Sequence, residues 1–279
     1  MKSKNYIIAD MMYNVNYSQS FTDSEDSPFL YDNCCQIDMS TIKINLELDA
    51  SIGIQQMKIN PSGIDGIKTQ IGYIIYIFNN KGNIVHLIQI DNEICNITVK
   101  SSSPQKQPFE GSVGEVIFRT SILFQKGIVV HASAIEYEGK GIIFSAPSGT
   151  GKSTHANLWV EHKSAIILNG DRPALRIIND EVNVYGTPWS GTSHQYVNKK
   201  APLKAIVLLE QSPINEIEKL SSEQAVRLLV ARCYLPYFDE QLMSLALDNI
   251  GCIIKKIPVY LLKCRPDIEA VEIVFKCLQ

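Results

Sequence analysis

The stretch Ser145-Ala-Pro-Ser-Gly-Thr-Gly-Lys-Ser-Thr154 decides how this chain folds and what it can bind. It follows the Walker A pattern G-x-x-x-x-G-K-[ST], with Ala146 at the first glycine position, where a small residue is tolerated. In such a loop the backbone N–H groups and the positive end of the following helix face the phosphates of a nucleotide. The motif therefore predicts a protein that uses ATP or GTP.

The surrounding sequence supplies the order that this motif requires. Residues 141–145 read as a short buried strand, and residues 154–161 read as an amphipathic helix. Lys152 is expected to reach the terminal phosphates, and the Ser153 hydroxyl is expected to bind Mg²⁺. A simple Gly-Ser turn before a helix would explain neither the glycine spacing nor the strand. The predicted nucleotide contacts are Pro147, Ser148, Gly149, Thr150, Gly151, Lys152, Ser153 and Thr154.

Composition and charge exclude few functions. A net charge of -3 over 279 residues favours neither nucleic acid nor an anionic membrane as a partner. The first residues have too short an apolar run for a signal peptide, and later segments fall short of the roughly 18 apolar residues needed to span a bilayer. We therefore expect a cytoplasmic protein. The seven cysteines are scattered and lack metal-binding spacing, so reduced, mostly buried thiols are expected.

The first part of the chain is predicted to be rich in β-structure. Short β-like runs cover residues 42–48, 71–78 and 84–90, and a turn at 79–82 joins the last two as a hairpin. The polar, proline-containing segment 101–108 is the expected boundary. The prediction is a β-rich domain over residues 1–110, with a role in substrate specificity, followed by a nucleotide-binding domain over residues 111–279.

The second part is predicted to be a mixed α/β domain of the α+β type. Residues 127–137 and 141–145 are joined by a tight turn, so these two strands must be antiparallel, whereas an ordinary P-loop strand lies in a parallel βαβ sheet. Further strands are expected at 164–169, 205–210 and 259–263, and a hairpin-like stretch is expected at 175–185. Helices are expected at 113–125, 221–234 and 239–255, with a last one starting near 266, so the C-terminal third is largely helical.

Asp171 is the best candidate for a metal ligand or a catalytic base. It ends the strand that follows the P-loop helix, where a carboxylate can meet Mg²⁺ or an acceptor hydroxyl, although the Asn-Gly-Asp sequence also suits a simple turn. Arg172 could contact a phosphate or remain in solvent. His131 lies in an apolar strand, where it could be either a core histidine or a catalytic one.

Residues 185–194 form a second loop rich in glycine, hydroxyl and aromatic residues, which suits contact with a substrate. Its candidate substrate residues are Thr187, Trp189 and His194, although Trp189 could instead anchor the loop and His194 could lie in solvent. His155 and His162, on the P-loop helix, are expected at the surface.

Taken in order, these motifs resemble the HPr kinase/phosphorylase family and its shorter relatives, which include kinases of ribosomally made peptide pathways. The resemblance covers residues 127–265 and rests on Val130-His-Ala-Ser133, residues 139–154, Asn169-Gly-Asp-Arg-Pro173 and Gly186-Thr-Pro-Trp189. It implies an HPr kinase/phosphoenolpyruvate carboxykinase-like core, ATP or GTP with Mg²⁺, a homo-oligomer, and an active-site role for His131.

One position departs from the family pattern. The family usually has two consecutive aspartates, of which the first serves as acid and base, and this chain has Gly170 there, before Asp171. Either Asp171 takes both roles, or His131 or His194 supplies the base, or transfer is lost. The leading hypothesis is a Mg²⁺-dependent kinase acting on a hydroxyl of a peptide, a protein serine or a small molecule. The alternatives are a nucleotide-binding sensor and a scaffold with a vestigial loop.

Overall fold

The computed structural model describes residues 2–17, 21, 26–31, 41–54, 63–104, 106 and 109–279. The chain divides into two compact units, Met1–Ser121 with Pro236–Gln241, and Ile122–Leu235 with Leu242–Gln279. The helix expected at 113–125 is observed as α1 (Ser112–Ser121) followed by the 3₁₀ helix η2 (Ile122–Gln125). The division falls between these two helices, because α1 packs within the first unit.

The described strands of the first unit form one seven-stranded sheet in the order β1-β2-β3-β7-β6-β5-β4. Buried residues alternate along β2, which is the pattern of a sheet with one covered face. Phe109 and α1 cover this face, since the Phe109 ring lies 4.8 Å from the Tyr6 ring and 5.2 Å from the Tyr13 ring. The strands are β1 (Lys2–Ile8), β2 (Met11–Tyr17), β3 (Thr41–Leu48), β4 (Ile64–Thr69), β5 (Gly72–Phe78), β6 (Ile84–Asp91) and β7 (Asn96–Ser101), and η1 (Ala50–Ile54) follows β3.

The second unit is built on a nine-stranded mixed sheet, counted over the described residues, with the central order β11-β9-β10-β14-β13-β12-β8. The long strand β14 pairs with β13 in an antiparallel manner through its first residues, and with β10 and β16 in a parallel manner through the rest. The strands are β8 (Gly127–Val129), β9 (Ala132–Tyr137), β10 (Lys140–Ser145), β11 (Ile166–Asn169), β12 (Ala174–Ile178), β13 (Glu181–Tyr185), β14 (Lys200–Gln211), β15 (Glu216–Lys219) and β16 (Val259–Cys264).

The predicted hairpin before the glycine-rich loop is confirmed, because β9 and β10 pair in an antiparallel manner. The prediction of one strand over 127–137 was wrong. The chain breaks at Val130 and His131, so that β8 pairs with β12 while β9 pairs with β10 and β11. The break has a physical cause: Val130 forms a bridge with Cys233, and the His131 N–H donates to the carbonyl oxygen of Arg232 at 2.7 Å.

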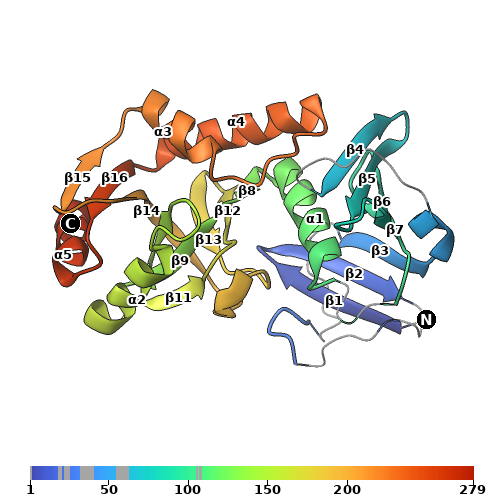
Figure 1. Cartoon of the computed structure of the whole chain (residues 1–279), viewed down its shortest axis with the longest axis horizontal. Helices are drawn as coiled ribbons and strands as arrows, with labels where there is room; N and C mark the ends of the chain where they lie inside the picture. Colours follow the sequence, from blue (N-terminus) through green and yellow to red (C-terminus); the bar gives the residue numbers. More distant parts are fainter. Residues whose placement is uncertain are drawn as a thin grey trace. The chain divides into compact units, whose positions relative to one another are not determined.

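Helices α2 (Lys152–Lys163) and α5 (Ile268–Leu278) pack with the sheet of the second unit (Figure 1). Trp159 of α2 is fully buried and shares one core with Phe144 of β10 and Val271 of α5. Burying a large apolar side chain contributes about 1.5–3 kcal/mol, so this core fixes α2, and with it the end of the glycine-rich loop. The remaining helices are η3 (Gly191–Ser193), α3 (Ser222–Val230) and α4 (Glu240–Lys256).

Three expectations from composition can be compared with the described residues. Over these residues no helix has the length and apolar character needed to cross a membrane, and no cluster of three or more His, Cys, Asp or Glu side chains offers a metal site. Cys95, Cys233, Cys252, Cys264 and Cys277 are free thiols. Two of them, Cys252 and Cys277, are exposed and the others are half-buried, so the expectation of mostly buried thiols was wrong for this part of the chain. Cys34 and Cys35 lie outside it.

Candidate functional site

The glycine-rich loop (residues 146–151) joins β10 to α2, in the order that the motif predicted. Gly149 and Gly151 have φ angles of +79° and +110°, a region that only glycine adopts without strain. An added side chain would meet no atom within 4 Å at either position, so backbone conformation, not space, requires glycine here. Gly151 precedes α2 without a side-chain cap, which leaves the N-terminal end of the helix as a site for an anion. The exposed predicted contacts are Pro147, Ser148, Gly149, Ser153 and Thr154.

Lys152 is the first residue of α2, and its side chain bends back over the loop. Its Nζ donates a hydrogen bond to the carbonyl oxygen of Ala146 at 3.3 Å, and the residue is only 7% exposed. Burial lowers the pKa of Lys152, Asp171 raises it, and the positive charge of Arg232 lowers it again, so that the pKa lies below its ordinary value. Asp171 and Arg232 are therefore the charged groups that act on the Lys152 ammonium.

The fully buried side chain of Asn169 builds the turn that carries Asp171. Its Oδ1 accepts hydrogen bonds from the backbone N–H groups of Asp171 at 2.9 Å and of Arg172 at 2.6 Å. Its Nδ2 donates to the carbonyl oxygens of Thr187 at 2.9 Å and Trp189 at 3.3 Å. Because both the oxygen and the nitrogen of this buried amide are hydrogen-bonded, the side chain holds the two segments in one geometry. Asn169 therefore ties the Asp171 turn to the loop that follows β13.

The Asp171 carboxylate lies between the His131 imidazole and the Arg172 guanidinium. Its Oδ1 is 3.2 Å from Nε2 of His131, and its Oδ2 is 3.2 Å from Nε of Arg172. Burial raises the pKa of Asp171, but the hydrogen bond with His131 and the charges of His131, Arg172 and Lys152 lower it by more, and the result is below the ordinary value. Asp171 is therefore ionised at neutral pH, and the structure brings together the four residues predicted to be catalytic: Lys152, Asp171, His131 and Arg172.

Residues 232–234, which follow α3, complete this cluster and were missed by sequence reasoning. The Tyr234 N–H donates to the carbonyl oxygen of Val129 at 3.0 Å, and the Tyr234 hydroxyl accepts from Nε of Arg172 at 3.1 Å. Arg232 lines a cavity beside the glycine-rich loop, with Pro147 and Thr150 among its other walls. None of the ion pairs of the described residues includes Arg232. No local motif marks this segment, because only the contact with the break at His131 brings it to the site.

The helix η3 covers Gly170 and Asp171. A Cβ atom at Gly170 would lie 2.0 Å from Oγ and 2.9 Å from Cβ of Ser193, so Ser193 occupies the space that an aspartate side chain at this position would need. Gly191 has a φ of +61°, and a Cβ there would come within 2.7 Å of Oδ2 of Asp171. Two glycines thus allow η3 to close over the carboxylate.

Two of the three predicted substrate residues are buried. Thr187 has no exposed surface, and its hydroxyl donates to the carbonyl oxygen of Arg172 at 2.7 Å. Trp189 is 5% exposed. Both residues support the Asp171 turn, and neither presents a side chain to a substrate in this structure. His194, which ends η3, is exposed. Hydroxyl and aromatic residues suit burial as well as binding, and in Thr187 and Trp189 they serve burial.

The protein belongs to the class of mixed α/β proteins that contain a strand–loop–helix of the P-loop type. The chain belongs to the family described as SynChlorMet cassette protein ScmC, whose model matches residues 94–270. A comparison with curated protein sequences gives no match. Among solved structures, the HPr(Ser) kinase/phosphatase from Coxiella burnetii is similar over 53% of this chain and 95% of that chain, with 12% identity and a TM-score of 0.31. So weak a likeness leaves the question of function to the residues of the site.

Proposed function

We propose that the protein binds a nucleoside triphosphate, ATP or GTP, at the glycine-rich loop and transfers the γ-phosphate to a hydroxyl group. The observation that carries this proposal is the set of charged groups around the glycine-rich loop: the Lys152 side chain lies over the loop, Arg232 lines a cavity beside it, and the charge of Asp171 acts on Lys152. Phosphoryl transfer needs charge neutralisation and an oriented nucleophile more than covalent chemistry. Two cations and one carboxylate beside a phosphate-binding turn meet that need.

Each residue has a distinct role in this proposal. The backbone of residues 147–154 holds the α- and β-phosphates, and Lys152 binds the β- and γ-phosphates. Arg232 faces the same region and adds a second positive charge for the γ-phosphate, where charge spreads during transfer. Arg172, His131 and Tyr234 hold the Asp171 carboxylate in position through the contacts described above.

The side chains also suit Mg²⁺. Ser153 is exposed at the start of α2, and Asp171 is an ionised, half-buried carboxylate. Mg²⁺ is usually held by one or two such oxygen ligands together with phosphate oxygens and water, so a larger protein cluster is not needed. Ser153 and Asp171 are the proposed ligands. A bound Mg²⁺ would neutralise charge on the phosphates.

Asp171 is also the proposed partner of the acceptor hydroxyl. The acceptor oxygen forms a bond to the γ-phosphorus while the bond from that phosphorus to the β,γ-bridging oxygen breaks, and the nucleoside diphosphate leaves. The hydroxyl proton passes to Asp171, with His131 hydrogen-bonded to the same carboxylate. Because the pKa of Asp171 is below its ordinary value, Asp171 is a weak base, and its main contribution is to orient the hydroxyl.

Gly170 supports a second candidate function, that of a nucleotide-binding module without transfer. The position that would carry the acid and base of the resembled family has no side chain, and Ser193 fills the space beside it. In that case the loop would bind nucleotide, and Asp171 would serve only in binding Mg²⁺.

One experiment separates the two candidates. The protein is mixed with ATP or GTP, Mg²⁺, and a pool of metabolites and serine-containing peptides, and the products are analysed by mass spectrometry with Lys152→Ala as the control. A species heavier by one phosphate that is absent from the control establishes a kinase and identifies its acceptor. Bound nucleotide that is neither hydrolysed nor transferred supports the binding module.

A further inference from the structure

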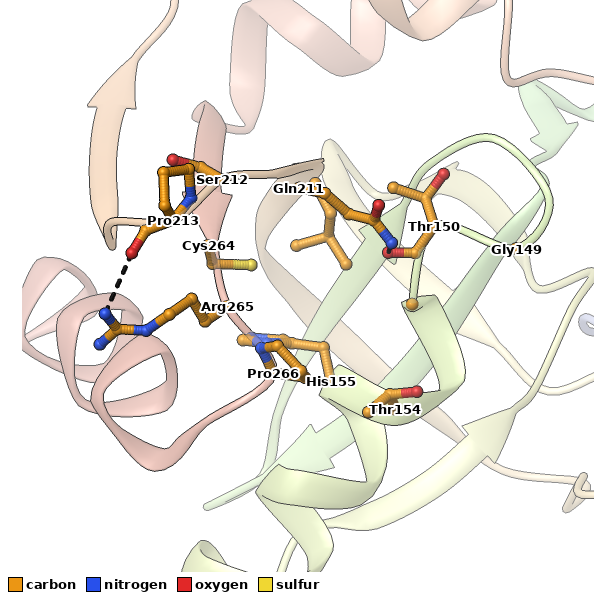
Figure 2. A pocket seen from close by; sticks show the side chains of 12 residues that line it. Gly149, Thr150, Thr154, His155, Gln211, Ser212, Pro213, Cys264, Arg265 and Pro266 are labelled. Carbon is orange, nitrogen blue, oxygen red and sulfur yellow. Dashed lines mark hydrogen bonds between the residues drawn. The ribbon is translucent and has the colours of Figure 1, made fainter.

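Two cavities border the glycine-rich loop of the second unit. The first, of about 490 Å³, lies between the loop with the start of α2 and the ends of β14 and β16. Figure 2 shows this cavity, with Thr150, Thr154 and His155 on the side of the loop and Cys264 and Arg265 among those facing them. The second cavity, of about 570 Å³, contains Arg232 and Ser145. Both volumes are within the range of small-molecule sites.

The charges around the loop give a bound triphosphate a direction. Lys152 of a P-loop meets the β- and γ-phosphates. Here Arg232 lines the second cavity together with Pro147 and Thr150 of the loop, and the charges of Arg232 and Asp171 act on the Lys152 ammonium. The γ-phosphate end of the chain therefore points toward Arg232 and the second cavity. The α-phosphate end must point away from them, toward the first cavity, which neither Arg232 nor Asp171 lines.

The first cavity suits the uncharged part of a ligand. Leu209, Pro213 and Pro266 contribute apolar wall. Two carboxylates compensate the charge of Arg265. Its Nε lies 2.8 Å from Oδ2 of Asp267, and its guanidinium also contacts Glu269 at 2.8 Å. Burial lowers the pKa of His155 to about 4, which keeps its ring neutral. Among the described residues that line this cavity, none has a side chain with an uncompensated positive charge, so the phosphates are left to the loop backbone and Lys152.

His155 supplies an unused polar group at this cavity, contrary to the expectation that it lies at the surface. It is 2% exposed, and its Nε2 accepts a hydrogen bond from the indole N–H of Trp159 at 3.3 Å. Because indole is only a donor, Nε2 must be unprotonated, and the single proton of the neutral ring is on Nδ1. Nδ1 is buried and has no hydrogen-bond partner. A buried donor without an acceptor is unfavourable, and native proteins rarely keep one without a reason.

We propose that the first cavity is the nucleoside site and that Nδ1–H of His155 donates a hydrogen bond to an acceptor atom of the base. This inference rests on the proposed nucleotide binding. It assigns the base to the space between His155 and the Cys264–Pro266 segment, and it leaves the second cavity, with Arg232, to the acceptor of the phosphate.

The test compares the binding of ATP with that of inorganic tripolyphosphate, which lacks the nucleoside, by calorimetric titration in Mg²⁺. His155→Phe keeps the ring and removes the donor, and it should weaken ATP binding about fivefold, the value of one ordinary hydrogen bond, while tripolyphosphate binding stays unchanged. His162→Phe, on the same helix but outside the cavity, is the matched control and should change neither. Equal affinity of wild type and His155→Phe for ATP would overturn the assignment.

A second measurement uses the wild-type protein and so does not depend on the folding of a variant. ATP carrying an azido group on its base is photolysed in the complex, and the labelled peptides are mapped. Labels on residues 212–213 or 264–266, which line the first cavity alone, support the assignment, whereas labels on residues 228–232 place the base in the second cavity and overturn it. If the wild type binds neither ATP nor tripolyphosphate, the proposed function itself fails together with the inference.

Discussion

Nε2 of His131 lies 3.2 Å from Oδ1 of Asp171, and the backbone joins the same two segments, because the N–H of Ala132 donates to the carbonyl oxygen of Asp171 at 3.0 Å. The break between β8 and β9 thus places an imidazole against the carboxylate next to the glycine-rich loop. The side chains and the backbone therefore both hold His131 and Asp171 in one relative position.

Asp171→Asn keeps the size of the side chain and removes its charge. We expect phosphate transfer to fall by about 100-fold or more, because the ionised carboxylate that orients the acceptor is lost. Nucleotide binding should change by less than about threefold, since most of it comes from the loop backbone and Lys152. Turnover and calorimetric titration measure the two effects. Asp180→Asn, at an exposed position in the same unit, is the control, and full activity of Asp171→Asn would remove Asp171 from the mechanism.

Arg232→Ala tests the residue that the sequence did not reveal. If Arg232 meets the γ-phosphate, this variant should bind ATP at least about tenfold more weakly and leave the affinity for ADP unchanged, as expected for the loss of a charge-assisted hydrogen bond. Arg227→Ala, on the exposed side of α3, should affect neither nucleotide. A parallel loss of ATP and ADP affinity would instead show that Arg232 supports the fold of the site.

Gly170→Asp restores the aspartate pair of the resembled family, but the structure leaves no room for it. The new Cβ would collide with Ser193, so we expect a loss of about 1–3 kcal/mol in the free energy of unfolding, as for other overpacked sites. Adding Ser193→Gly should recover most of this loss. Urea unfolding of the two single variants and the double variant measures it. A Gly170→Asp protein as stable as wild type would mean that η3 is not fixed over this position.

Stability should fall as the pH falls below about 6.5, because two buried histidines resist protonation. Burial lowers the pKa of His86 in the first unit and of His155 in the second to about 4, from an ordinary value of 6.5. In the unfolded chain both take up a proton near 6.5, so their contribution is complete above that pH and is lost as the pH falls toward 4. Between pH 7 and pH 5 each should cost about 2 kcal/mol.

Urea unfolding at the two pH values checks this, with His155→Phe as the comparison. The pH dependence should become smaller by the contribution of His155, and an unchanged dependence would show that this ring does not titrate as its burial requires.

The local parts of the fold could be predicted from sequence. The glycine spacing gave the strand–loop–helix, and the capping box of Ser221 and Gln224 is present at the start of α3. The tight turn after Tyr137 required the antiparallel pair β9–β10. In each of these cases a few neighbouring residues determine the structure, because turns and helix caps depend on local sequence.

The parts that could not be predicted depend on contacts between distant segments. The sequence predicts one continuous strand around His131, whereas the bridge from Val130 to Cys233 and the backbone hydrogen bond from His131 to Arg232 break that strand. The sequence predicts Thr187 and Trp189 as candidate substrate residues, because it does not show that Asn169 binds their carbonyl oxygens in the interior. Local pattern identified the candidate residues, and long-range hydrogen bonds decided which of them face the site.

The most direct test of the central claim is a calorimetric titration of the wild-type protein and of Lys152→Ala with ATP and Mg²⁺. The account predicts saturable binding to one site in the wild type and a loss of at least about tenfold in affinity for the variant, because a buried cation that meets the phosphates is removed. Equal affinity of the two proteins, or no binding by the wild type, would contradict the assignment of the glycine-rich loop as a nucleotide site.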